Sequence, residues 1–270
     1  MRRLYITFSG ARYHGTTRKI VENAQKFGAT QPSIIYDDIW ITEHPFYTQN
    51  QWLWEHPGDR QGVKRGYGWF AWKPVIILHT LEMMDDGDIV LYTDADTYPI
   101  HDLSTLYTTC HDEGGIMLFE AMGCDHQHWC KRDCFIAMGQ DTDEYRFRLH
   151  GAARFMLFEK GPWRPKQFLC EWLAYCLNRN CQTFDPSVIS PEHPELTEHR
   201  TEQAIMTNLA HRYNIPLHRE ACDFGNPAIL SGMRPNDTYP QLFKQVGVPW
   251  PYPPPLPVTG SEFRNVPDAL

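Results

Sequence analysis

Hydrophobic and polar positions at the start of the chain predict a strand, a helix and a second strand. Apolar runs at residues 4–8 and 33–36 are typical of short buried strands. Between them, apolar residues recur at helical spacing, and Gly28 marks the expected end of a helix. The apolar face of that helix comprises Ile20, Val21, Ala24 and Phe27. A strand–helix–strand opening is typical of a parallel α/β sheet.

The clearest pattern in the sequence follows an irregular stretch. Residues 37–68 are aromatic and polar without a regular period, so we expect no regular elements there. Pro74 suits the first turn of a helix, where a missing N–H costs nothing. The helix is expected to bury Val75, Ile76, Leu78, Leu81 and Met84. An Asp-Asp-Gly-Asp turn then leads into a predicted strand at 89–93, which runs directly into Asp94 and Asp96.

Weaker patterns predict further elements in the second half of the chain. Apolar runs at 116–119 and 155–158 indicate strands. Apolar residues at helical spacing predict helices at 167–177 and 202–213. Together with the opening segment, these elements predict one α/β domain with a mostly parallel, mixed sheet of Rossmann type, flanked by helices.

Length and composition fit this single domain followed by a tail. The chain has 270 residues, of which 42% are hydrophobic, as expected for a folded protein. Six prolines lie between residues 249 and 257, a density that excludes a helix or a central strand. We therefore assign residues 1–245 to the domain and 246–270 to a proline-rich tail.

Charge and hydropathy narrow the class of protein. The formal net charge is −8, which disfavours a broad nucleic-acid surface but leaves a local basic groove open. The apolar runs all fall short of the ~18 residues needed to span a membrane. The start, MRRLYITFSG, resembles neither a signal peptide nor an anchor. We therefore expect a cytoplasmic protein whose eight cysteines are reduced.

The two aspartates after the strand at 89–93 are the leading candidates for chemistry. In open α/β sheets, ligands bind at the carboxyl ends of the strands, where Asp94 and Asp96 are expected. A pair of carboxylates suits Mg²⁺ or Mn²⁺, which prefer oxygen ligands, and a bound cation would keep both ionised. In the alternative interpretation, Asp94 begins a turn and Asp96 caps a following helix.

The segment GYGWFAWKPVIILHTLEMMDDGDIVLYTDAD, residues 66–96, resembles nucleotide-sugar-dependent glycosyltransferases of GT-A type. Members with a similar pattern carry an aromatic segment ending in WKP, a helix, a DGD turn and a strand ending in the DxD motif. Three later pieces resemble the same group in the same order: GAARFMLFEK, like an "aGfmlf" strand, the CEWLAYC helix, and EHRTEQAIMTNLAHRYNI, like an "HR-DQ" helix. The resemblance covers residues 4 to about 225 and implies a GT-A-like fold.

The resemblance implies a donor site around the aspartates. Asp94 and Asp96, with Ala95 between them, match the DxD motif and would hold a divalent ion on the donor diphosphate. Lys73 would contact phosphate. Trp72 or Trp69 would stack on the base or sugar of the donor. Alternatively, Trp72 belongs to the hydrophobic core. Thr7, Phe8 and Ser9, at the end of the first strand, would receive the nucleoside.

The late motif implies residues on the sugar and acceptor side. Gln203 matches its glutamine, while Glu202 replaces its usual aspartate with a longer carboxylate. Both join Asp94 and Asp96 as candidate catalytic residues. His199 and Arg200 would contact phosphate or sugar, or else form a solvated helix entrance. A third metal ligand would come from His218 or His199. Alternatively, each of these histidines has a purely structural role.

The stretch CDHQHWCKRDC, residues 124–134, allows two interpretations. Three cysteines and two histidines suggest zinc, but the paired C-x2-C spacing of zinc sites is missing. In the resembling family this region faces the acceptor, which favours contacts through Asp125, His126, His128 and Trp129. Of these four residues, we take His126, His128 and Trp129 as candidate members of the acceptor or sugar site.

This resemblance implies a hexosyltransferase-like enzyme dependent on Mn²⁺ or Mg²⁺, with a UDP-sugar as the favoured donor. The acceptor is open between a glycan, a protein, a lipid headgroup, a small molecule and a modified nucleic-acid base. Two alternatives remain: a nucleotidyltransferase on a similar sheet, and a non-catalytic carbohydrate-binding protein. The first would need a triphosphate loop where the sequence reads SGARYHGTTRK. The second would not need the aspartate pair.

Overall fold

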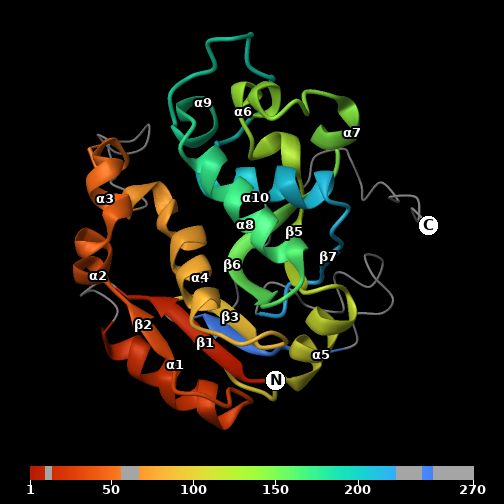
Figure 1. Ribbon diagram of the computed structural model, residues 1–270. Helices are drawn as coiled ribbons and strands as arrows, with labels where there is room; N and C mark the ends of the chain where they lie inside the picture. Colours follow the sequence, from red (N-terminus) through yellow and green to blue (C-terminus); the bar gives the residue numbers. More distant parts are fainter. Residues whose placement is uncertain (10–13, 56–66, 223–238, 246–270) are drawn as a thin grey trace.

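The computed structural model describes residues 1–9, 14–55, 67–222 and 239–245. Their centre is a six-stranded sheet in the order β2-β1-β3-β6-β5-β7 (Figure 1). The strands are β1 (Arg3–Phe8), β2 (Ile34–Tyr36), β3 (Ile89–Asp94), β5 (Ile116–Asp125), β6 (Leu149–Glu159) and β7 (Leu217–His218). A two-stranded sheet pairs β4 (Thr97–Pro99) with β8 (Phe243–Gln245).

The main sheet is mixed and mostly parallel, as the sequence predicted. β1 pairs in parallel with β2 and β3, and β5 pairs in parallel with β7. β6 alone runs against its neighbours β3 and β5 in the part of the chain described. The carboxyl ends of β1 and β3 therefore meet at one edge, where Phe8 lies opposite Asp94.

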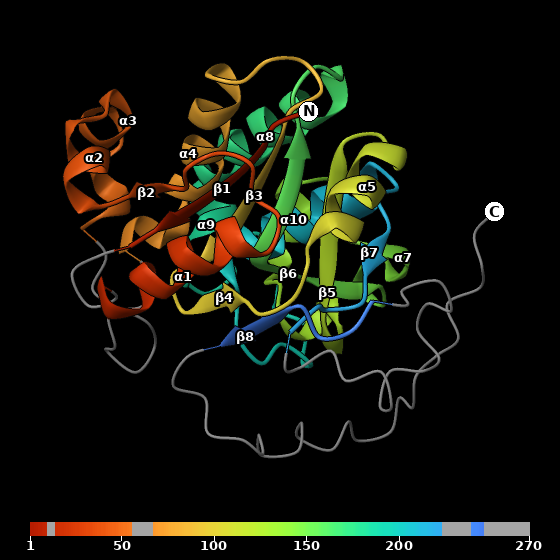
Figure 2. The same cartoon turned by 90° about the horizontal axis from the view of Figure 1, so that it is seen from below.

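Helices cover both faces of the sheet (Figures 1 and 2). The longer helices are α1 (His14–Lys26), α4 (Trp72–Glu82), α5 (Ser104–Asp112), α8 (Trp163–Cys176) and α10 (Thr201–Arg212). α4, α8 and α10 share one hydrophobic core with the sheet, whereas α1 and α5 share a second core on its other face with β8. Short helical segments complete the described chain: α2 (Asp38–Glu43), α3 (Pro45–Gln49), η2 (Gln51–Leu53), η3 (Tyr67–Phe70), η4 (His126–His128), α6 (Arg132–Ala137), α7 (Asp143–Arg146) and α9 (Arg179–Gln182).

The structure confirms the predicted strands and helices and extends several of them. α4 begins at Trp72, two residues before Pro74, and β5 and β6 are longer than their apolar runs. Leu78, predicted to be buried, is only partly so.

The prediction of irregular structure at residues 37–68 is wrong for residues 37–55 and 67–68, and residues 56–66 lie outside the described residues. Asp37 caps α2 by accepting from the backbone N–H of Trp40 at 2.8 Å. Pro45 occupies the first turn of α3. These caps start helices too short to produce a readable hydrophobic period.

The alternative interpretation of Asp96 as a helix cap is also wrong, because Asp96 lies in a turn and strand β4 begins at the next residue. The proline-rich tail assigned to 246–270 lies outside the described residues. All eight cysteines lie within the described chain and are free thiols. Among the described helices, each is too short or too polar to cross a bilayer.

Candidate functional site

The site forms where β3 leaves the sheet. The Thr7 hydroxyl donates to the Thr93 carbonyl oxygen at 2.8 Å, which ties the ends of β1 and β3 together. Asp94 follows as the last residue of β3, with its side chain 35% exposed. The carboxylate of Asp94 therefore reaches the edge of the sheet where ligands bind in open α/β folds.

A buried lysine joins this aspartate to α10. Lys73 Nζ lies 3.2 Å from Asp94 Oδ1, 3.1 Å from Glu202 Oε1 and 2.9 Å from the Ala153 carbonyl oxygen. The residue is only 3% exposed, so the three acceptors replace water around its ammonium group. Phe70 contributes a ring face, with Nζ 4.9 Å from the ring centroid. Lys73 thus links Asp94 at the sheet edge to Glu202 at the start of α10.

A left-handed turn places Lys73 in this position. Gly68, Trp69 and Phe70 all have φ between 52° and 57° immediately before α4. A Cβ on Gly68 would lie 2.7 Å from the Trp54 ring, so the turn requires glycine there. Gln182 donates to the Trp69 carbonyl oxygen at 2.7 Å and holds the turn in its strained conformation.

Electrostatics favour a charged Lys73. Burial lowers the pKa of Lys73, but attraction to Asp94 and Glu202 outweighs it and raises the pKa above its ordinary value. Burial raises the pKa of Glu202, and the ammonium group is the main charge that opposes this rise. Burial raises the pKa of Tyr92 well above its ordinary value, so its hydroxyl stays protonated. This hydroxyl donates a hydrogen bond to Asp94 Oδ1 at 2.5 Å.

Asp96 is held by two neutral donors. The Thr97 hydroxyl donates to Oδ1 at 2.9 Å, and the Gln245 amide on β8 donates to Oδ2 at 2.7 Å. Arg154 on β6 lies 3.5 Å from Glu220, and despite burial its pKa is raised by Glu220, Cys222 and the two aspartates. Sequence reasoning missed Gln245 and Arg154. The only available signal was Arg154 itself, which stands where the resembling strand pattern has glycine.

The aspartate pair fits a divalent cation by the chemistry of its donors. Both side chains offer carboxylate oxygens, and Asp94 Oδ2 has no hydrogen-bond partner among the described residues. Hard oxygen donors of this kind suit Mg²⁺ and Mn²⁺. Within the described chain, however, no three His, Cys, Asp or Glu side chains gather as a ligand set.

The predicted third ligand is therefore not brought to the aspartates. His218 Nε2 is hydrogen-bonded to Glu113 Oε2 at 2.8 Å, at the end of α5. His199 is buried, with Nδ1 accepting from the Lys131 backbone N–H and Nε2 donating to the Cys181 carbonyl oxygen at 2.6 Å. Burial lowers the pKa of His199 to about 3. Both histidines are engaged in protein contacts.

The tryptophans predicted to stack on a ligand belong to the core. Trp72 is 4% exposed, stacks on Phe8 with ring centroids 4.0 Å apart, and donates to the Tyr67 carbonyl oxygen. Trp69 is 5% exposed and packs on Phe184. Trp72 therefore takes the core position of its alternative interpretation, and Trp69 is buried in the same way. Ser9 is also buried, and its hydroxyl is hydrogen-bonded to the Thr17 hydroxyl.

The predicted acceptor residues separate into buried and accessible groups. His126 is fully buried, so it does not face an acceptor in this structure. His128 and Trp129 are partly exposed, and the Arg200 guanidinium lies 4.7 Å from the Trp129 ring centroid. The Arg200 backbone N–H also donates to the Trp129 carbonyl oxygen at 2.9 Å, which fixes η4 to the entrance of α10.

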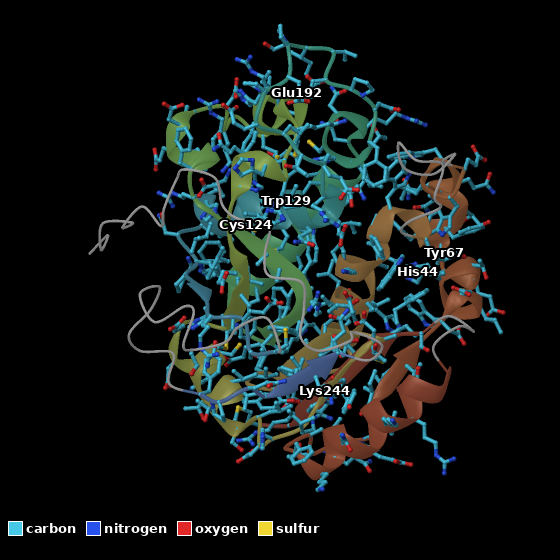
Figure 3. All side chains as sticks on the ribbon, turned by 180° about the vertical axis from the view of Figure 1, so that it is seen from behind. His44, Tyr67, Cys124, Trp129, Glu192 and Lys244 are labelled. Atoms are coloured by element: carbon cyan, nitrogen blue, oxygen red, sulfur yellow. The ribbon has the colours of Figure 1, made fainter. Side chains whose placement is uncertain are left out.

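The cysteine-rich stretch forms no zinc site. Trp129 hydrogen-bonds the Cys124 thiol, and the two side chains lie together in Figure 3. Cys130 and Cys134 instead face the Asn208 amide, at 3.6 and 3.8 Å. Burial raises the pKa of Cys134 well above its ordinary value, so this thiol stays protonated.

Comparison with solved structures supports a glycosyltransferase-like fold. Mouse xyloside xylosyltransferase 1 aligns with a TM-score of 0.50 over 94% of this chain and all of that chain, at 9% sequence identity. The bifunctional glycosyltransferase WbbM aligns at a TM-score of 0.44 and 9% identity, over 77% of this chain and 37% of its own. The glycosyltransferase GlyE of Streptococcus pneumoniae TIGR4 aligns with a TM-score of 0.42 at 15% sequence identity, over 91% of this chain and 54% of that chain. No family model and no curated protein matches the chain.

Proposed function

We propose that this protein transfers a sugar from a nucleotide-sugar donor, a UDP-sugar in particular, to an acceptor. The observation that carries the proposal is the placement of Asp94 and Asp96 at the carboxyl edge of the sheet, with Asp94 joined through buried Lys73 to Glu202. The full-length fold similarity to a xylosyltransferase supports it.

In the proposed reaction, Asp94 and Asp96 would hold a Mn²⁺ or Mg²⁺ ion, which would supply positive charge to stabilise the departing nucleoside diphosphate. Lys73 keeps Asp94 and Glu202 in fixed positions, since it donates to both from a site closed to water. Gln203, partly exposed at the start of α10, contacts the sugar, whereas the neighbouring Glu202 is buried and acts through its ion pair with Lys73. The ends of β1 and β3 receive the nucleotide.

Thermal-shift measurements with nucleotide-sugars, with and without Mn²⁺, test the proposal. We expect metal-dependent stabilisation by one nucleotide-sugar, and loss of that shift in Asp94→Asn. Asp112→Asn, a matched change on the exposed end of α5, should keep it. Mass spectrometry of candidate acceptors incubated with the enzyme and a donor mixture then detects the transferred sugar.

Two outcomes would replace the proposal. Stabilisation by a nucleoside triphosphate alone would indicate a nucleotidyltransferase. Metal-independent stabilisation by free sugars would indicate a carbohydrate-binding protein. Equal transfer in chelator and in Mn²⁺ would overturn the metal-dependent scheme.

A further inference from the structure

A row of buried neutral groups leads from Gln203 into the interior between β6 and α10. Gln203 Nε2 lies 2.9 Å from the Gly151 carbonyl oxygen and 2.9 Å from His150 Nε2. The row continues from His150 Nδ1 to His126 Nδ1 at 2.9 Å, from His126 Nε2 to Asn208 Oδ1 at 3.1 Å, and from Asn208 Nδ2 to Met138 Sδ at 3.3 Å. The amide, carbonyl and thioether groups in this row have fixed donor and acceptor atoms, whereas the two histidine rings can donate or accept according to their tautomer.

The outer end of the row fixes the direction of every hydrogen bond. A backbone carbonyl oxygen only accepts, so the Gln203 atom facing Gly151 is the amide nitrogen. Its other N–H donates to His150 Nε2, which must therefore be unprotonated. The His150 proton then lies on Nδ1 and is donated to His126 Nδ1. His126 consequently carries its own proton on Nε2.

The inner end fixes the same directions independently. The Met138 thioether sulfur has no proton and only accepts, so the Asn208 amide nitrogen faces it. Asn208 Oδ1 then faces His126 and requires a proton on His126 Nε2. The His126 Nδ1 lone pair in turn requires a proton on His150 Nδ1. The two ends of the row therefore give the same assignment of tautomers and amide orientations.

Burial keeps both histidines neutral. His126 is fully buried and His150 is 2% exposed. Burial, the largest effect, lowers both pKa values well below the ordinary one, and the positive charge of Arg200 lowers the pKa of His150 further. A cationic His150 would present a second N–H to the Gln203 amide and break the row, so the low pKa protects the arrangement.

We infer that His150 and His126 are positioning residues that hold Gln203 with its amide nitrogen inward and its carbonyl oxygen, Oε1, toward the site, where Oε1 accepts a hydrogen bond from a hydroxyl of the donor sugar. This inference rests on the proposed function. Both amide N–H groups are used inside the protein, and Gln203 is partly exposed beside Glu202. An amide oxygen only accepts, so its ligand must donate, as a sugar hydroxyl does and a phosphate oxygen does not.

The same strand supports Gln203 and Lys73. The Gly151 carbonyl oxygen holds Gln203, and the Ala153 carbonyl oxygen, two residues along β6, holds Lys73. The Gln203 amide and the Lys73 ammonium group are therefore bound to nearby carbonyl oxygens of one strand, and Glu202, the neighbour of Gln203 in the chain, pairs with Lys73. This placement favours the sugar of the donor over its nucleotide as the ligand of Gln203.

Nitrogen-15 NMR of the unsubstituted protein tests the row without any ligand. We expect proton-bearing Nδ1 in His150 and proton-bearing Nε2 in His126, in neutral rings throughout pH 6–8. The opposite tautomer or a cationic ring in either residue would overturn the inference. Because no substitution is involved, this measurement does not depend on the folding of a variant.

Calorimetric binding in Mn²⁺ separates positioning from mere packing. In His150→Leu, we expect affinity for the stabilising UDP-sugar to fall about five- to tenfold, the value of one hydrogen bond, with affinity for UDP unchanged. His150→Gln keeps an accepting oxygen and a donating N–H in the same order, so it should restore UDP-sugar affinity. An unchanged UDP-sugar affinity in His150→Leu, or an equal loss for UDP, would overturn the inference. If the unsubstituted protein bound neither ligand, the proposed function and the sugar ligand would fall together, and NMR would still decide the tautomers.

Discussion

The ammonium group of Lys73 offers a quantitative test of the site, through the substitution Lys73→Met. Asp94 is 35% exposed at its side chain and can be hydrated when its partner is lost, but Glu202 is only 3% exposed. Glu202 must therefore either remain charged in the interior or take up a proton. Protonation at pH 7 of a carboxyl with an ordinary pKa of 4.5 costs about 3.4 kcal/mol, at 1.36 kcal/mol per pH unit. This figure lies within the range of about 3–5 kcal/mol for breaking a buried ion pair.

The pH dependence of this loss identifies Glu202 as its source. The cost of protonating Glu202 falls to about 1.4 kcal/mol at pH 5.5, so the variant should be about 2 kcal/mol less destabilised there than at pH 7. Denaturant unfolding of both proteins at both pH values measures the difference. Loss of the donor to Ala153 adds a contribution that does not change with pH.

Two further variants complete this test. Lys73→Met combined with Glu202→Gln should show no such pH dependence, because the titrating group is gone. Lys166→Met, a matched change at an exposed position of α8, should stay within about 0.5 kcal/mol of the unsubstituted protein. A loss in Lys73→Met that is the same at pH 7 and pH 5.5 would refute the reasoning.

Three other predictions follow from the fold and the site. Asp94→Asn and Asp96→Asn should each reduce sugar transfer at least about a hundredfold with little change in melting temperature; retained activity in either would remove the basis for a metal-bound donor. Gly68→Ala should lower the free energy of unfolding by more than about 2 kcal/mol, because it combines a positive φ with a clash against Trp54, and denaturant unfolding measures this; a neutral result would contradict the geometry of the turn. His199 and His211, whose pKa values burial lowers to about 3 and about 4, bind protons more readily unfolded than folded. Stability should therefore fall as pH drops below about 6.5, with a slope of up to about 1.4 kcal/mol per pH unit for each, and a flat unfolding profile from pH 6.5 to 4.5 would contradict burial of these rings.

The strands of the sheet could be predicted from the sequence because each central strand contains a continuous apolar run. The pattern that ends in Asp94 sets the strand, its direction and the position of the carboxylate within a few residues. The same periodicity could not show where α2 and α3 begin, because their caps act over three residues and leave no repeating face.

The site was harder to predict because its contacts join distant positions. Lys73 and Glu202 were both identified as candidates, yet only folding shows that one ammonium group connects Glu202 with Asp94. The predicted stacking of Trp69 and Trp72 on a ligand was not confirmed, since both rings are buried. The local sequence around a tryptophan does not show whether its ring faces a ligand or the core. Burial, which decides between the two, is a property of the whole fold.

The pairing of β8 with β4 has a consequence for biosynthesis. Gln245 and Asp96 are 149 positions apart in the chain, yet one amide hydrogen bond joins them. A ribosome therefore makes the aspartate long before its partner emerges, and nascent chains ending ahead of Phe243 lack this brace. This edge of the sheet is therefore completed only after residue 245 has been translated.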